Sequence, residues 1–333
     1  MVRAMNARMR SMTLAAHDLS LSSRSLLALL WFASLAACSS TYRVGLRATE
    51  AAVALEQVTH GDGRELNPAV SRDGKVLAFE VALPNGTRRV ATMSLAADPP
   101  SPPRLAEGTG EQVAWMPDGE GLVFVAPVRG APALVQTFGQ TASSSAFWTP
   151  VADPYLRPAW PSVSPDGRAI AMSLVTTHVF ETHTGRREWL DPALVVSDLH
   201  GTGVVAMGLG TEPSWSPDAS RLVFARRAGE RTHLFVSAPK VSAHAQPITD
   251  GPDDDAHPAW SPDGALIAFC SSPAAEGEAA RSNLFVVRPD GTGLRQVTEG
   301  DAVACRPAWA PGHAIYFHAQ FDGQSHIWRL RMR

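Results

Sequence analysis

The chain has 333 residues, a formal net charge of −3 at neutral pH and a hydrophobic content of 45%. That length fits one large β domain or two smaller domains, and it allows a sizeable core. The 29 basic residues form no basic stripe and accompany no aromatic platform, so we expect no nucleic-acid partner.

The N-terminal segment has the pattern of an export signal. Arginines precede the apolar run at residues 26–33, and small residues lead from this run into Cys38. The run is too short to span a bilayer comfortably, and its flanks suit a signal peptide. We therefore predict that residues 1–37 are a signal peptide. Without them the net charge becomes −6.

The string Leu35-Ala36-Ala37-Cys38 resembles the bacterial lipobox, in which the cysteine is lipidated and the signal is cut before it. An ordinary signal peptide cut near Ala37, with Cys38 incidental, is the alternative. Lipidation would hold the protein at a membrane through several acyl chains, with residues 38–53 as a tether. Serine directly after the cysteine resembles the residue that directs lipoproteins of Gram-negative bacteria to the outer membrane. We thus expect a lipid anchor in the outer membrane that faces the periplasm.

From residue 54 onward the chain repeats a motif of the form Pro-x-Trp-Ser-Pro-Asp-Gly. The clearest copy is residues 258–264, followed by the apolar run 266–269. Related strings begin at Pro68, Val113, Pro161, Pro213 and Pro307. The motif aspartates are 45, 48, 52 and 45 residues apart, and Gly312 takes the sixth place 49 residues later: Asp73, Asp118, Asp166, Asp218 and Asp263. This period is typical of a propeller or solenoid with one small sheet per repeat.

Each repeat has the pattern of four short strands. In the fifth, an apolar Trp-bearing strand at 258–261 precedes the turn Pro262-Asp263-Gly264, and further strands follow at 266–269, 284–287 and 296–298. A four-stranded sheet cannot bury both faces alone, so neighbouring sheets must stack. The sequence therefore predicts an all-β domain at residues 54–333, a six-bladed β-propeller.

The two ends of this domain predict how the ring closes. The chain ends on a third strand, 327–330, with no fourth strand after it, whereas residues 54–59 stand ahead of the first repeat. Their Gln57-Val58-Thr59 matches the fourth-strand string Gln296-Val297-Thr298. We predict that residues 54–59 complete the last blade, which leaves only short, protected edges. An open solenoid would need a polar capping repeat at each end, and none is visible.

The Trp-Ser-Pro-Asp-Gly repeats, the preceding Val-Thr strands and the six-fold count resemble the propeller of the TolB family. TolB is a periplasmic component of the Tol–Pal envelope system, and its propeller binds the peptidoglycan-associated lipoprotein. The resemblance implies this fold and an envelope protein or peptide as partner. Such repeats also occur in peptidase propellers and sugar lyases. The chain departs from TolB because only about fifteen residues separate Cys38 from the first strand, which leaves no room for TolB's N-terminal α/β domain.

Two further cysteines lie in neighbouring repeats. Cys270 ends the second strand of the fifth repeat and Cys305 begins the first strand of the sixth, so both lie at the same rim of adjacent blades. An exported protein permits a disulfide between them. Two small buried thiols are the alternative, which the sequence slightly favours.

A candidate ligand site lies where the first strands begin. In the usual propeller order this end lines the mouth of the channel. The residues directly before the motif prolines, with Gln112 in the equivalent place of the second repeat, would face it: Asn67, Gln112, Trp160, Glu212, His257 and Arg306. This mixture suits a peptide or polar ligand better than a metal. A long loop in the third repeat, residues 178–189, would open on the same face. The alternative is a water-filled channel with a solvated loop.

The leading functional hypothesis is a lipid-anchored, monomeric, non-catalytic scaffold that binds an envelope protein or peptide. We predict no cofactor and no metal site. Asp253-Asp254-Asp255 has no EF-hand spacing and is expected to be a solvated acidic loop. The alternative is an envelope lyase or hydrolase that uses Glu212, His257 and Arg306 in the channel. A third possibility is a spacer subunit in a larger complex.

Overall fold

The computed structural model describes residues 45–61, 63–96, 100–106, 108–137, 144–148, 156–182, 185–240, 244–273 and 281–333. Of residues 144–148, 177–182 and 185–191 only the backbone is described. The predicted signal peptide and Cys38 lie outside this set. No helix within the described ranges is long and apolar enough to cross a membrane.

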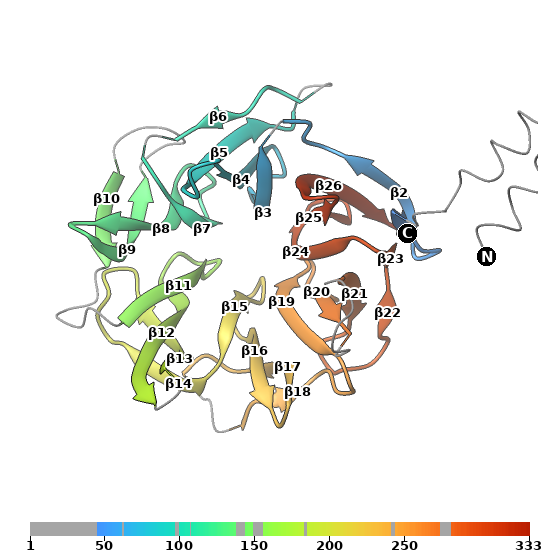
Figure 1. Cartoon of the computed structure of the whole chain (residues 1–333). Coiled ribbons are helices and arrows are strands. Elements are labelled where there is room, and N and C mark those ends of the chain that lie inside the picture. The colour runs from blue at the N-terminus through green and yellow to red at the C-terminus, as the bar shows by residue number, and fades with distance from the viewer. Residues whose placement is uncertain are drawn as a thin grey trace, which may run out of the picture. The chain divides into compact units, whose positions relative to one another are not determined.

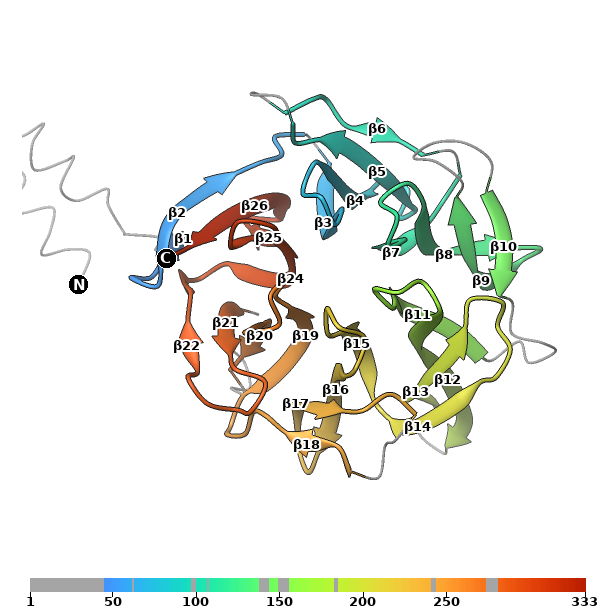
Figure 2. The ribbon, with the colours of Figure 1, turned by 180° about the vertical axis from the view of Figure 1, so that it is seen from behind.

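Six four-stranded antiparallel sheets surround a central axis (Figures 1 and 2), which confirms the predicted six-bladed propeller. The innermost strands are β3 (Arg64–Val70), β7 (Glu111–Trp115), β11 (Leu156–Val163), β15 (Thr211–Trp215), β19 (Asp254–Trp260) and β24 (Val303–Ala310). The second strands are β4 (Val76–Ala82), β8 (Leu122–Val128), β12 (Ala169–Thr182), β16 (Leu222–Ala228), β20 (Ile267–Ser272) and β25 (Ala314–Phe321).

The third strands are β5 (Arg88–Ser94), β9 (Ala131–Thr137), β13 (Gly185–Asp198), β17 (Arg231–Ser237), β21 (Asn283–Val287) and β26 (Gln324–Met332). The outermost strands are short: β6 (Arg104–Leu105), β10 (Ser144–Trp148), β14 (Val205–Leu209), β18 (Gln246–Pro247), β22 (Arg295–Gln296) and, from the N-terminal end of the domain, β2 (Ala52–Gln57).

The N-terminal strand closes the ring as predicted. Strand β2 pairs antiparallel with β26, with Leu55 opposite Leu330, and the amide of Val58 donates to the carbonyl of Ile327. Part of the segment predicted as the tether belongs to a small sheet. There β1 (Leu46–Ala48) pairs with β23 (Thr298–Gly300), which follows the outer strand of blade 5.

The repeated turn is a hydrogen-bonded unit. In blade 5 the Ser261 hydroxyl donates to Asp263 Oδ1 at 2.6 Å and accepts the amide of Leu266 at 2.9 Å, while Gly264 adopts a φ of +72°. The same contacts recur at Ser71, Ser164 and Ser216. The motif serine and aspartate therefore have a structural role, because their hydrogen bonds fix the turn between the first and second strands.

The core lies between neighbouring blades. Fully buried aromatic rings occupy one register position of the second strands: Phe79, Phe224, Phe269 and Phe317. Phe224 of blade 4 packs on Leu194 and Met207 of blade 3. A Cβ on Gly210 would come within 2.9 Å of this ring, so only glycine leaves it room. Each such ring contributes about 1.5–3 kcal/mol through burial of apolar surface.

Two local predictions from the sequence are wrong. The segment predicted as a long loop in blade 3 is the end of a β-hairpin, because β12 and β13 stay paired from Ala169–Asp198 out to Thr182–Gly185. The predicted acidic loop is only partly solvated. Asp255 lies within β19, opposite Ser271, and is 5% exposed, and its carboxylate lies 3.5 Å from His233 Nδ1.

Candidate functional site at the channel mouth

The six residues that the sequence places at the channel mouth share one unusual backbone conformation. Each of the innermost strands contains a register shift at this point. All six have a φ between 51° and 58°, which is uncommon for residues other than glycine: Asn67, Gln112, Trp160, Glu212, His257 and Arg306. A β-bulge re-aims the side chain of the residue that it displaces. The bulge is thus a constant feature of the blade.

These six residues line a single cavity of about 330 Å³ along the channel, together with the apolar motif residues that follow them on the same strands. Trp115, Trp260 and Trp309 lie further along it. The structure therefore brings the whole predicted set together around one space, although the six residues are spread over some 240 positions of sequence.

Each bulge also carries a contact between blades. In two blades the bulge side chain accepts the amide of the next bulge residue: Gln112 Oε1 accepts from Trp160 at 2.8 Å, and Glu212 Oε2 accepts from His257 at 2.7 Å. In three other blades a side chain of the second strand accepts the amide of the bulge residue in the next blade. Glu80 accepts the amide of Gln112 at 2.6 Å, Ser173 that of Glu212 at 3.2 Å and His318 that of Asn67 at 3.4 Å.

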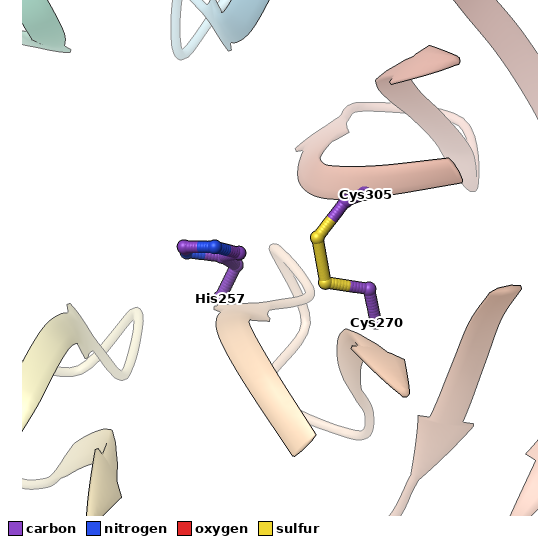
Figure 3. A group of neighbouring side chains, drawn as sticks. All are labelled: His257, Cys270 and Cys305. Atoms are coloured by element: carbon purple, nitrogen blue, oxygen red, sulfur yellow. A yellow bond between two sulfur atoms is a disulfide. The ribbon is translucent and has the colours of Figure 1, made fainter. Parts of the chain in front are cut away.

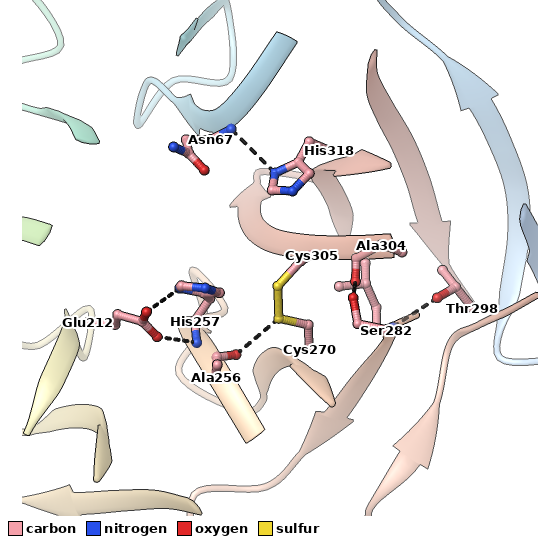
Figure 4. Close-up of a disulfide and its surroundings, with 11 residues drawn as sticks. Asn67, Glu212, Ala256, His257, Cys270, Ser282, Thr298, Ala304, Cys305 and His318 are labelled. Carbon is pink, nitrogen blue, oxygen red and sulfur yellow. Dashed lines mark hydrogen bonds and ion pairs between the residues drawn. A yellow bond between two sulfur atoms is a disulfide. The ribbon is translucent and has the colours of Figure 1, made fainter. Parts of the chain in front are cut away.

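The sixth junction is covalent. Cys270 of the second strand lies opposite Ala256 of the first strand. It thus occupies the same register position in blade 5 as Glu80, Ser173 and His318 occupy in their own blades. It forms a disulfide with Cys305 of blade 6, with the two Cα atoms 5.1 Å apart (Figure 4). Of the two alternatives from the sequence, the structure has the disulfide and not the slightly favoured pair of thiols. The disulfide thus replaces the hydrogen bond at this junction.

Glu212 and His257 form a hydrogen-bonded pair in which the carboxylate carries the charge. His257 Nδ1 lies 2.8 Å from Glu212 Oε1. Burial raises the pKa of the Glu212 carboxyl, but the nearby His257 and Arg306 outweigh this effect, so that its pKa falls below the usual value. Burial holds the pKa of His257 below its ordinary value. At neutral pH the Glu212 carboxylate therefore accepts a hydrogen bond from Nδ1–H of the neutral His257 imidazole, which leaves Nε2 as the basic nitrogen.

Arg306 faces this pair from blade 6. Its guanidinium carbon lies 3.7 Å from the centroid of the Trp160 ring, in cation–π contact, and the Trp160 and His257 rings lie 5.5 Å apart. Burial lowers the pKa of Arg306 to about 10, despite the attraction of Glu212 and Glu80. Arg306 is therefore cationic at neutral pH. The mouth combines a stacked cation, an aromatic face and an oriented carboxylate–imidazole pair.

The sequence missed the second-strand residues that support the ring. Burial raises the pKa of Glu80, whose carboxylate oxygens contact Asn67 and Arg88 as well as the amide of Gln112. A polar side chain inside the apolar runs Phe79-Glu80-Val81 and Phe317-His318-Ala319 is the available signal. Cys38 lies outside the described residues. The side chains of residues 178–189 are not described, so their part in the site stays a prediction.

Comparison with solved structures identifies the architecture. A structure assigned as TolB from Agrobacterium tumefaciens superposes with a TM-score of 0.59 at 17% identity, over 83% of this chain and 96% of that one. TolB from Acinetobacter baumannii gives a TM-score of 0.55 at 17% identity, over 78% and 64%. The fold is that of a TolB-type six-bladed propeller.

The same propeller fold also occurs in enzymes. An oligogalacturonate lyase from Vibrio parahaemolyticus gives a TM-score of 0.54 at 13% identity, over 86% of this chain and 96% of that one. No family model matches the sequence. In sequence the chain is 27% identical over 107 residues to an uncharacterized peptidase, YuxL, of Bacillus subtilis. That match covers 30% of this chain and only 16% of YuxL, so it concerns a small part of that protein.

Proposed function

We propose that this protein is a lipid-anchored scaffold of the cell envelope that binds a peptide segment of another envelope protein at the channel mouth. The observation that supports this most is the set of six bulge residues around one cavity of about 330 Å³. A cavity of this size accommodates a few side chains of a partner. The rigid blades hold the surrounding groups in place before binding, which reduces the entropy lost on association.

The chemistry of the mouth suits a peptide. Trp160 and Arg306 stack on each other, and tryptophan and arginine are the residue types that most often dominate the binding energy of an interface. Asn67 Nδ2 and Gln112 Oε1 already bond to Glu80 and to the Trp160 amide, so Asn67 Oδ1 and Gln112 Nε2 are the amide atoms that can pair with a peptide backbone. The contact with His257 fixes the orientation of the Glu212 carboxylate. An ionised carboxylate only accepts hydrogen bonds, so it would favour a partner that presents a donor to it.

Site-specific crosslinking tests the proposed face. A photoreactive amino acid at Gln112, introduced into the full-length protein in cells, should give a defined adduct with one envelope protein. Arg306→Glu or Trp160→Ala should reduce the adduct at least tenfold. Arg331→Glu, an exposed arginine on β26 outside the cavity, is the matched charge control and should leave it unchanged. An adduct that survives both mouth substitutions in folded variants would exclude this face.

The anchor is a separate part of the proposal and rests on the sequence of residues 26–38. Mass spectrometry of protein from membranes should show an acylated Cys38, and Cys38→Ser should move the protein to the soluble fraction. Sucrose-gradient separation of the two membranes would place the anchored form. We expect this soluble variant to be a monomer in light scattering. Persistence of Cys38→Ser at the membrane would contradict the anchor.

A second candidate function is an envelope lyase or hydrolase that acts on a polymer. The observation that favours it is the 2.8 Å contact between Glu212 and His257, which orients a neutral imidazole as a general base inside a cavity, with Arg306 nearby to stabilise a developing anion. Uronate-containing polysaccharides are the first substrates to assay. Turnover that falls at least a hundredfold in His257→Asn, with crosslinking unchanged, would favour this candidate over the scaffold.

A further inference from the structure

Beside the ring of bulge residues lies a cluster of three side chains with metal-ligating atoms. A ring nitrogen of His257 and the Sγ atoms of Cys270 and Cys305 lie within 4.8 Å of one another (Figure 3). His257 lines the channel cavity, whereas Cys270 is 2% exposed and Cys305 is half-buried. The cluster thus places the two sulfur atoms beside an imidazole that lines the channel.

We propose that the dithiol form of Cys270 and Cys305 binds one zinc ion together with His257, and that the disulfide is the metal-free form of the same site. Two thiolates and one imidazole are a known three-ligand set for zinc, with the fourth position left to water or substrate. Because His257 lines the cavity, that open position would face the channel. This inference does not depend on which partner the channel mouth binds.

The surroundings of His257 support a ligand role. Metal-binding histidines usually donate their second ring N–H to a carboxylate, which fixes the tautomer and the orientation of the ring. Glu212 Oε1 lies 2.8 Å from Nδ1 of His257, and its other oxygen accepts the amide of the same residue (Figure 4). Glu212 therefore holds His257 at two points, one on the ring and one on the backbone, and leaves Nε2 as the nitrogen available to a metal.

The geometry fits zinc after a small adjustment. The Cα atoms of the two cysteines are 5.1 Å apart, close enough for both sulfurs to reach one ion. Tetrahedral zinc sets its sulfur and nitrogen ligands about 3.5–3.8 Å apart. The sulfurs must separate and the imidazole must move inward by about 1 Å, which side-chain torsions supply. Arg306, next to Cys305, opposes a cation, and the two thiolate charges offset it.

The two forms are related by a balanced exchange. An external dithiol breaks the Cys270–Cys305 bond, so that two electrons and two protons pass to the two sulfurs while the reductant closes its own disulfide. Zinc then displaces both thiol protons as two Zn–S bonds form. Oxidation of the site would accordingly release the ion.

The test is a zinc titration of the full-length chain carrying Cys38→Ser, so that Cys270 and Cys305 are its two remaining cysteines. With a competing chelator, the form reduced by a dithiol should bind one equivalent of zinc at least a hundredfold more tightly than the oxidised form. Cobalt added to the reduced form should give a thiolate charge-transfer band, and Cys305→Ser should abolish it. Near-ultraviolet circular dichroism reports whether each form is folded.

His257→Gln is the sharper variant, because it keeps both thiols and the disulfide. It should weaken zinc binding by the reduced form at least tenfold, whereas His244→Gln, at an exposed histidine outside the cluster, should leave it unchanged. Three results would each overturn the proposal: a reduced protein that unfolds, a folded reduced protein that binds zinc no better than the oxidised one, or unchanged affinity in His257→Gln.

Discussion

Glu65 Oε2 lies 2.8 Å from His326 Nδ1, across the junction between the first blade and the last. The same carboxylate accepts the Thr59 hydroxyl at 2.6 Å, and that hydroxyl accepts the amide of Ile327 at 2.8 Å. Glu65 is buried, so these contacts are shielded from water. One acidic side chain therefore joins residues 261 positions apart at the point where the ring closes.

We expect Glu65→Ala to destabilise the protein by about 3 kcal/mol, because it leaves the buried Thr59 and His326 without their partner. It should also open the closure locally. Amides of residues 52–59 and 327–331 should lose hydrogen-exchange protection before the rest of the domain unfolds. Urea denaturation measures the first effect, and exchange followed by mass spectrometry measures the second.

A matched control exists at another junction. Asp255, Thr249 and His233 occupy the corresponding positions between blades 4 and 5, where the chain is continuous, with Asp255 Oδ2 3.5 Å from His233 Nδ1. Asp255→Ala should lower the free energy of unfolding by a similar amount yet leave exchange at residues 52–59 unchanged. Retained protection of β2 in Glu65→Ala would show that backbone pairing with β26 holds the ring without this network.

The repeat period made the blade count and the closing strand predictable from the sequence, because Trp-Ser-Pro-Asp-Gly chemistry fixes one turn per blade. The position directly before the motif prolines was also sufficient to place Glu212 and His257 at one cavity. The sequence could not place Glu80 or Ser173, since their partners lie one blade away and depend on the register between strands. Hydrogen bonds of this kind follow from packing of blades and leave no fixed spacing.

The hairpin of blade 3 shows a second limit of prediction from the sequence, which is that composition does not separate strands from loops. Its polar composition at residues 178–189 resembles a loop, yet β12 and β13 stay paired to their ends. Two strands that pair with each other satisfy their backbone groups whatever the outward side chains are, so composition alone does not distinguish such an extension from a loop.

Ser173 should contribute to stability far more than an exposed serine does. It is fully buried and accepts the amide of Glu212, and Ser173→Ala leaves that buried donor without a partner. We expect a loss of about 1–2 kcal/mol in the free energy of unfolding from urea denaturation. Ser220→Ala, on the exposed Asp218 turn, should cost less than half as much. Equal losses would mean that the amide of Glu212 finds another acceptor.

Ala219 occupies a turn position that is glycine in four other blades, and its φ is 58°. A non-glycine residue in this conformation costs about 1–2 kcal/mol, part of which the entropy of an added glycine offsets. Ala219→Gly should therefore raise the free energy of unfolding by about 0.5–1 kcal/mol. Gly167→Ala is the reverse change in blade 3, where the new Cβ would meet only an ordinary contact of 3.8 Å to Pro117. It should destabilise by about 1 kcal/mol, and a change of the same sign in both variants would refute the strain argument.

His318 should make the folded state sensitive to mild acid. Burial, reinforced by the positive charges of Arg306 and other nearby groups, lowers its pKa to about 3, whereas an unfolded chain titrates histidine near 6.5. Between these two values the unfolded state binds the extra proton. Stability contributed by this site is therefore complete above pH 6.5 and falls as the pH drops toward 3, by up to about 1.4 kcal/mol per pH unit.

His318→Asn keeps an acceptor near the Asn67 amide and removes the titrating group. Urea midpoints at pH 7.5, 6.5, 5.5 and 4.5 should fall more steeply for the wild type than for this variant, and the gap between the two curves should widen toward acid. His200→Asn, at an exposed histidine, should follow the wild-type curve. Carboxylate protonation is common to all three proteins, so the difference between the curves isolates the imidazole. Parallel curves for wild type and His318→Asn would mean that His318 takes up its proton in the folded propeller as readily as in the unfolded chain.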